Sequence, residues 1–222
     1  GPGAAAFAAD VTKIGFTKAF LEMKIPEMLE KAFKAEGKKG LPQREGAVFC
    51  STELVKAAPT SALLLFSSLT YLLDLQGDKS KPLGEASKAA ADLLFKQVDE
   101  NLVPVVLPEL LKTVHTPAGN VDRFKKIAEL CVIAPGPMAM HLSEAIPACV
   151  PFMKDLKKSV ASRSKKALKA LCDTCTNPDM EEFIPILVQC IEDLDQVPET
   201  VFKMSSTVFV AEVDSSALAI MV

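Results

Sequence analysis

Apolar and polar residues alternate along the chain with a period of three to four positions, the spacing of amphipathic α-helices. In the stretch 160–171, Val160, Ala167, Leu168 and Leu171 share one side, and Arg163, Lys165, Lys166 and Lys169 fall largely on the other. Breaks rich in proline, glycine, asparagine and aspartate interrupt the pattern at 37–42, 77–82, 116–120, 135–137, 177–178 and 195–198. The pattern predicts about ten or eleven helices of 10–18 residues, no strand and no long linker.

The predicted helices recur in pairs. The first member of each pair begins near a proline: Pro26, Pro59, Pro104, Pro147 and Pro185. Proline suits the first helical turn because the N–H group that it lacks has no partner there. The second members align at Arg44, Gly84, Arg123, Arg163 and Phe202, at intervals of 40, 39, 40 and 39 residues. Helix pairs with a period near 40 are typical of HEAT and armadillo repeats, which bury their apolar faces against neighbouring pairs. We therefore predict an all-α fold, an α-α superhelix of about five helix pairs forming a HEAT/armadillo-like solenoid.

The repeats predict the domain organisation. Residues 1–3, Gly-Pro-Gly, have the composition of a cleaved-tag scar, and residues 4–222 are expected to form a single HEAT-repeat domain. We expect repeats near 4–58, 59–100, 101–136, 137–177 and 178–222. A natural solenoid closes with a polar cap, whereas this chain ends on the apolar half-helix 217–222. We therefore expect the chain to be a fragment of a longer protein.

Composition limits the function classes. Hydrophobic residues make up 49% and charged residues 24%, which supports a packed core, and the net charge of −3 argues against capture of nucleic acid by the whole molecule. The longest apolar stretch, 62–75, contains Asp74 and is too short and polar for a membrane span of about 20 residues. Six cysteines without a secretory leader favour reduced, buried thiols and a cytoplasmic location.

Catalytic and metal-binding motifs are weak. Cys172 and Cys175 form one CxxC pair, but a structural zinc needs four ligands, and His115 and His141 are far apart in the sequence. Neither histidine has a serine or cysteine arranged as a nucleophile. We expect buried structural cysteines, no metal, no small-molecule substrate and no catalysis.

Basic clusters are the strongest candidate site. If second helices begin along one edge of a solenoid, Arg123 and Arg163 lie one repeat apart, and such a row can follow the phosphates of RNA. The alternative is a solvated helix face that keeps the protein soluble. The candidate RNA-contact residues are Arg123, Lys125, Lys126, Lys157, Lys158, Arg163, Lys165 and Lys166.

The last third of the chain resembles the HEAT region of translation elongation factor three, a fungal-type ribosome-associated ATPase. The resemblance rests on residues 179–185, 189–191, 197–201, 207–213 and 217–222. Residues 104–178 match that family in layout, and residues 4–100 match only as generic helical repeat. The HEAT repeats of the general-control activator of a stress kinase are related and remain an alternative.

The resemblance implies a non-catalytic scaffold that docks on the ribosome, both ribosomal RNA and ribosomal proteins, during translation elongation. ATP would bind only in ABC cassettes downstream, because no G-x-x-x-x-G-K-[ST] phosphate loop occurs here and this chain is expected to need no cofactor. The alternative function is a HEAT scaffold that binds a protein or peptide along one face, as in a general-control-activator-like regulator. We expect a monomer.

Overall fold

A computed structural model describes residues 2–175, 185, 188–189, 192–193 and 195 of the chain. The chain divides into two compact units, Gly1–Asn120 and Val121–Val222. All regular structure among the described residues is helical, which confirms the all-α prediction. Unit 1 contains α1 (Pro2–Ile14), α2 (Phe16–Glu22), α3 (Ile25–Phe33), α4 (Leu41–Ala57), η1 (Pro59–Ser68), α5 (Leu69–Leu75), α6 (Lys81–Phe95), η2 (Glu100–Leu102) and α7 (Val103–Leu111). Helix α8 (Pro117–Ile133) begins in unit 1, and unit 2 continues with α9 (Pro135–Ala139), α10 (Leu142–Cys149), η3 (Val150–Lys154) and α11 (Lys158–Cys172).

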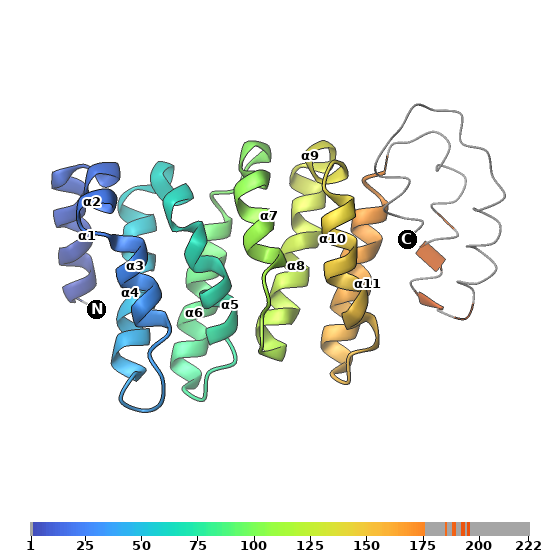
Figure 1. Ribbon diagram of the computed structural model, residues 1–222, viewed down its shortest axis with the longest axis horizontal. Helices are drawn as coiled ribbons and strands as arrows, with labels where there is room; N and C mark the ends of the chain where they lie inside the picture. Colours follow the sequence, from blue (N-terminus) through green and yellow to red (C-terminus); the bar gives the residue numbers. More distant parts are fainter. Residues whose placement is uncertain (1, 176–184, 186–187, 190–191, 194, 196–222) are drawn as a thin grey trace. The chain divides into compact units, whose positions relative to one another are not determined.

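Helices of unit 1 pack in two rows. Helix α4 packs against α1 on one side and α6 on the other (Figure 1), while α3 packs against α4 and η1, and α5 packs against α6 and α7. Consecutive helix pairs therefore stack side by side, because one pair cannot bury its apolar faces alone. The stacking is what the 40-residue period predicts. The predicted single domain and its repeat boundaries stay a prediction, and the pair expected at 178–222 lies outside the described residues.

Proline positions explain where the first helix of each pair begins and why it is short. Pro26, Pro59 and Pro104 lie in the first turns of α3, η1 and α7, as predicted. Pro147 does not begin a helix, because α10 starts earlier at Leu142 and carries Pro147 in its interior. An interior proline removes one helical hydrogen bond, and the α-helix ends at Cys149, where η3 begins.

Helix lengths depart from the predicted range in the first members of the pairs. The second members α4 and α8 have 17 residues and α6 and α11 have 15, within the prediction. The first members are shorter, with nine residues in α3 and α7, eight in α10 and seven in α5, which follows the 3₁₀ helix η1. In α7 and α10 an interior proline, Pro108 or Pro147, interrupts what the periodicity alone would assign to one longer helix.

The apolar stretch at 62–75 forms the centre of unit 1. Phe66, Leu69, Leu72 and Leu73 in η1 and α5 are fully buried. Each such side chain contributes roughly 1.5–3 kcal/mol when it leaves water. Among the described residues, none of the helices combines the length and apolar composition that crossing a bilayer requires. The stretch 62–75 is therefore part of the protein core. This agrees with the polar residues within it, which argued against a membrane span.

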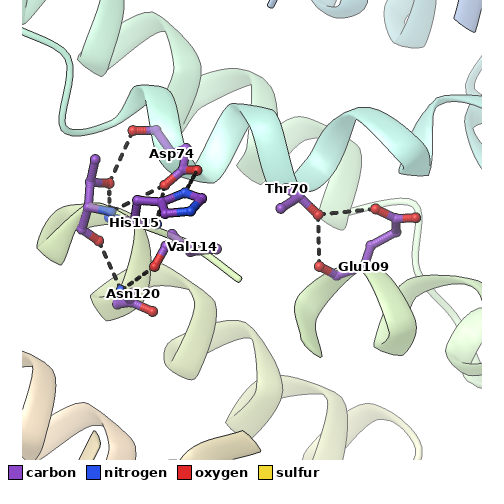
Figure 2. Close-up of polar contacts among 8 residues, drawn as sticks. Thr70, Asp74, Glu109, Val114, His115 and Asn120 are labelled. Atoms are coloured by element: carbon purple, nitrogen blue, oxygen red, sulfur yellow. Dashed lines mark hydrogen bonds and ion pairs between the residues drawn. The ribbon is translucent and has the colours of Figure 1, made fainter. Parts of the chain in front are cut away.

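Polar contacts attach the loop after α7 to the end of α5 (Figure 2). Asp74 accepts hydrogen bonds from the backbone N–H groups of His115, at 2.5 Å, and Thr116, at 3.2 Å. The Thr116 hydroxyl donates to the Asp74 carbonyl at 3.1 Å, and the buried Asn120 amide donates to the Val114 carbonyl at 2.8 Å. The loop therefore has its backbone groups satisfied and holds the start of α8 against α5 within unit 1.

Close backbone approach at the start of α8 generates a stability prediction. A Cβ added at the buried Gly119 would lie 2.8 Å from the Leu73 carbonyl carbon and closer still to its oxygen, so Gly119→Ala should reduce the free energy of unfolding by about 1–3 kcal/mol. A Cβ at Gly46, in the interior of α4, meets no atom within 4 Å, so the matched change Gly46→Ala should add about 0.5–1 kcal/mol through helix propensity. Urea unfolding followed by circular dichroism measures both. Equal midpoints for the two variants would contradict the packing at Gly119.

Candidate nucleic-acid interface

Helix α11 has one buried side and one basic side. Val160, Ala167, Leu168 and Leu171 are buried, and the hydroxyl of the buried Ser164 donates to the Cys149 carbonyl at 2.7 Å. These contacts hold α11 against α10 and η3 within unit 2 (Figure 1). The four cations predicted on the other side, Arg163, Lys165, Lys166 and Lys169, are exposed or half-exposed. Together with Lys157 and Lys158 at the start of the helix they form what we call the α11 basic face.

The α11 basic face lacks compensating charge. Lys157, Lys158, Lys166 and Lys169 are exposed, and Arg163 and Lys165 are half-exposed. The sequence contains no acidic residue from 157 to 172, and in the described part of the chain none of the six cations forms an ion pair. Cations one turn apart on a helix repel each other by a few tenths of a kcal/mol. The face therefore keeps a positive potential that a polyanion can neutralise.

Two candidate residues are buried, which corrects the predicted basic row. Arg123 is 2% exposed and Lys126 is 1% exposed, so neither side chain can reach a phosphate in this fold. The Arg123 guanidinium lies over the rings of Phe124 and Phe152, 4.5 and 4.8 Å from their centroids. These are cation–π distances, and they give the side chain a structural role.

Lys126 is part of a buried ion pair. Its ammonium lies 3.0 Å from Asp122, which precedes it by one helical turn and is also buried. A buried charge is tolerated only with partners of this kind. Lys125 is exposed, and its ammonium lies 3.4 Å from Glu129, so its charge is largely compensated. The structure therefore brings together five of the eight predicted residues, those on α11.

Arginine at the repeat position has a structural role in unit 1 as well. Arg44, 79 residues before Arg123, donates to the carbonyls of Ala35, at 2.6 Å, and Gly37, at 3.1 Å. It also lies 3.1 Å from Asp78, and both side chains are nearly buried. Sequence reasoning missed this role. The sequence signal for this role is Asp78 in the break at 77–82, because an aspartate in the next turn can pair with Arg44. A search for clusters of basic residues does not consider such acidic partners.

Cysteines and histidines take structural positions. Cys172 and Cys175 are buried, as predicted, and burial raises the pKa of Cys172 to about 12. His115 Nδ1 lies 2.9 Å from Asp74, and His141 precedes α10 with its Nδ1 3.7 Å from Glu144. The described residues contain no cluster of three or more potential metal ligands. Cys190 lies outside the described residues.

Comparison with known proteins identifies the family. The family model described as "EF3 N-terminal HEAT repeat" matches residues 2–168. The chain belongs to the EF3 N-terminal HEAT repeat family. This membership confirms the HEAT fold class, in agreement with the stacked helix pairs of unit 1.

Several EF3 relatives are similar to this member of the EF3 N-terminal HEAT repeat family. "Elongation factor 3" of Phytophthora infestans is 34% identical over 163 residues, which cover 71% of this chain and 15% of the relative. "Elongation factor 3" of Eremothecium gossypii is 33% identical over 162 residues, 68% of this chain and 16% of the relative. "Elongation factor 3B" of Saccharomyces cerevisiae is 28% identical over 207 residues, 91% and 20% respectively. The chain thus spans a fifth or less of these relatives.

The EF3 family match confirms the resemblance and corrects its extent. We expected residues 179–222 to be specific and residues 4–100 to match only as generic helical repeat. The family match covers 2–168, so the N-terminal half belongs to the family as well. Similarity between helical repeats is distributed over many packing positions, so no short run of residues in 4–100 shows it.

The buried ion pair on α8 leads to a stability prediction. Asp122→Ala would remove the carboxylate beside the Lys126 ammonium and should reduce the free energy of unfolding by about 3–5 kcal/mol. Glu129→Ala removes the partner of the exposed Lys125 on the same helix and should cost less than about 1 kcal/mol. Chemical denaturation of both variants checks this pair. Similar losses in the two proteins would contradict the burial of Lys126.

Thiol burial leads to a labelling prediction. Burial raises the pKa values of Cys131, Cys149 and Cys172 to about 12, so the reactive thiolate is scarce in the folded protein near pH 8. Iodoacetamide should label the half-buried Cys50 before Cys131, Cys149 and Cys172, at a rate on the order of 10-fold higher or more. Peptide mass spectrometry at successive times measures the order. In urea, as a control, the four cysteines should react alike.

Proposed function

We propose that this chain is a non-catalytic scaffold that docks an elongation-factor-3-like protein on the ribosome during translation elongation. Its family membership supports the assignment to EF3-like proteins, and its relatives carry the name "Elongation factor 3". The chain covers only 15–20% of those three relatives. We place ATP binding in other parts of the whole protein, and we propose that this part acts in the cytoplasm as a monomer without a cofactor.

The observation that carries the proposal is the α11 basic face. The face contains six cations, five of them on α11 and Lys157 directly before it. The segment 157–172 contains no acidic side chain. Lysine and arginine contacts to phosphate give affinity without reading sequence. The segment also contains no aromatic residue, so stacking on bases is not part of the proposed contact. We infer that the face binds the phosphate backbone of ribosomal RNA.

Spacing along α11 suits a row of phosphates. Lys158, Ser162 and Lys166 follow one another at intervals of four residues, which is about 6 Å along a helix axis. Ser162 and Lys166 are both exposed. A row of donors with this rise can contact successive phosphates of one strand while the buried side of α11 stays in place. The scaffold therefore needs no rearrangement of unit 2 to present the face.

Charge reversal on α11 is expected to remove docking. The triple variant Lys158→Glu, Lys165→Glu and Lys166→Glu changes exposed or half-exposed side chains, and glutamate at position 158 is favourable near the helix N-terminus. If the original chain makes three phosphate contacts, its binding should weaken roughly 20- to 40-fold as salt rises from about 50 to 200 mM. Co-sedimentation of this chain with purified ribosomes across that salt range measures the effect. The triple variant should fail to pellet with ribosomes even at low salt.

The matched control reverses three exposed lysines of unit 1, Lys31, Lys88 and Lys96. It has the same net charge as the α11 variant and should pellet like the original chain. Equal losses in both variants would mean non-specific attraction and would contradict docking through α11. Pelleting that is insensitive to salt and to both variants would favour the alternative scaffold, which binds a protein partner through apolar contacts.

A further inference from the structure

Ser159 is an exposed hydroxyl where an irregular segment enters α11. Leu156 before it is 99% exposed, and Lys157, Lys158 and Ser159 are exposed as well. The backbone between η3 and α11 is non-helical, and Asp155 accepts a hydrogen bond from the Lys157 N–H at 2.7 Å. Residues 155–157 are already non-helical and Ser159 is the second residue of α11, so an enzyme that binds an extended peptide needs to unwind only the first turn of the helix.

The side chains around Ser159 are basic. Lys157 and Lys158 directly precede it, and Arg163 follows four residues later, one turn along the same side of the helix. Arg163 is half-exposed and makes no hydrogen bond or ion pair within the described residues. Kinases select substrates by complementary charge, and a serine preceded by two lysines suits a kinase whose substrate groove is acidic.

We propose that Ser159 is a phosphorylation site for a basophilic serine kinase, and that phosphate there weakens the contact of the α11 basic face with RNA. The second half rests on the proposed function. In the reaction, the Ser159 Oγ bonds to the γ-phosphorus of ATP, the bond to the bridging oxygen breaks, and ADP leaves. The hydroxyl proton passes to the catalytic base of the kinase. The products are phosphoserine, ADP and a proton.

Phosphoserine at this position changes charge without disrupting the helix. It adds about −1.5 to −2 charges at pH 7 and three strong acceptor oxygens. Arg163, at i+4, lies on the same side of the helix and can pair with those oxygens, so the phosphate occupies a cation that RNA would otherwise use. An anion in the first turn also interacts favourably with the free N–H groups there. The helix stays folded while its exposed side loses positive potential.

The site assignment is tested by labelling. The chain is incubated with ATP, Mg²⁺ and the catalytic domain of a basophilic serine kinase, and phosphopeptides are mapped by mass spectrometry. Phosphate should appear on Ser159 and disappear in Ser159→Ala, whereas Ser162→Ala should be labelled as well as the original chain. Ser162 is the matched control because it is exposed on the same helix but one turn further inside it. Phosphate on other serines with none on Ser159 would overturn the assignment.

The effect on docking is tested with phosphoserine incorporated at position 159 during synthesis. Ribosome co-sedimentation at about 100 mM salt should weaken roughly 10-fold, and the melting temperature should stay equal or rise by about 1–3 °C. Unchanged pelleting would overturn the regulatory role. If the unmodified chain itself fails to pellet, the proposed function is contradicted instead. The labelling and the melting temperature then still decide whether Ser159 is a modification site compatible with a folded α11.

Discussion

Burial of a helix on two sides is the constraint on which unit 1 depends. Helix α4 packs against α1, α3, α6 and η1, and its buried residues are Ala47, Val48, Ser51, Leu54 and Val55. A helix in this position cannot bury its apolar side with its own pair alone, because α6 and η1 of the following pair also pack against it. Close approach of backbone segments requires small residues where they touch. Gly84 in α6 lies against the Gln76 carbonyl, and a Cβ added at this glycine would lie only 2.9 Å from the carbonyl oxygen.

Stacking also determines what charged residues can do. At the repeat position, Arg44 and Arg123 have little contact with solvent and bond to loop carbonyls or lie over aromatic rings. On α11 the cations are exposed or half-exposed, on the side opposite the buried residues of the helix. A cation buried between stacked helices stabilises the fold and cannot contact a partner. An exposed cation retains its positive potential at the surface and can attract an anionic partner. Burial therefore separates the basic residues of this chain into structural residues and candidate docking residues.

Much of the fold could be predicted from the sequence, and less of the site. Helical periodicity, the prolines that begin α3, η1 and α7, and the 40-residue interval through Arg44 and Gly84 were sufficient for stacked helix pairs. The periodicity of α11 was sufficient for its basic face. Short first helices were missed because a period does not show where an interior proline such as Pro147 ends the α-helix. Arg123 and Lys126 were placed outside because charge is an unreliable guide to exposure when partners lie one turn away.

The helical class, the pairing of helices and the basic, acid-free composition of residues 157–172 follow from the amino-acid sequence alone. These properties are local, since they depend on spacing within one or two helical turns. Helix packing, in contrast, makes Asp122 and Lys126 a buried pair, brings Asp74 to the backbone N–H of His115 and places Gly119 against Leu73. Burial is a property of how helices pack against one another, and the same lysine can be a core residue or a docking residue depending on which side its neighbours cover.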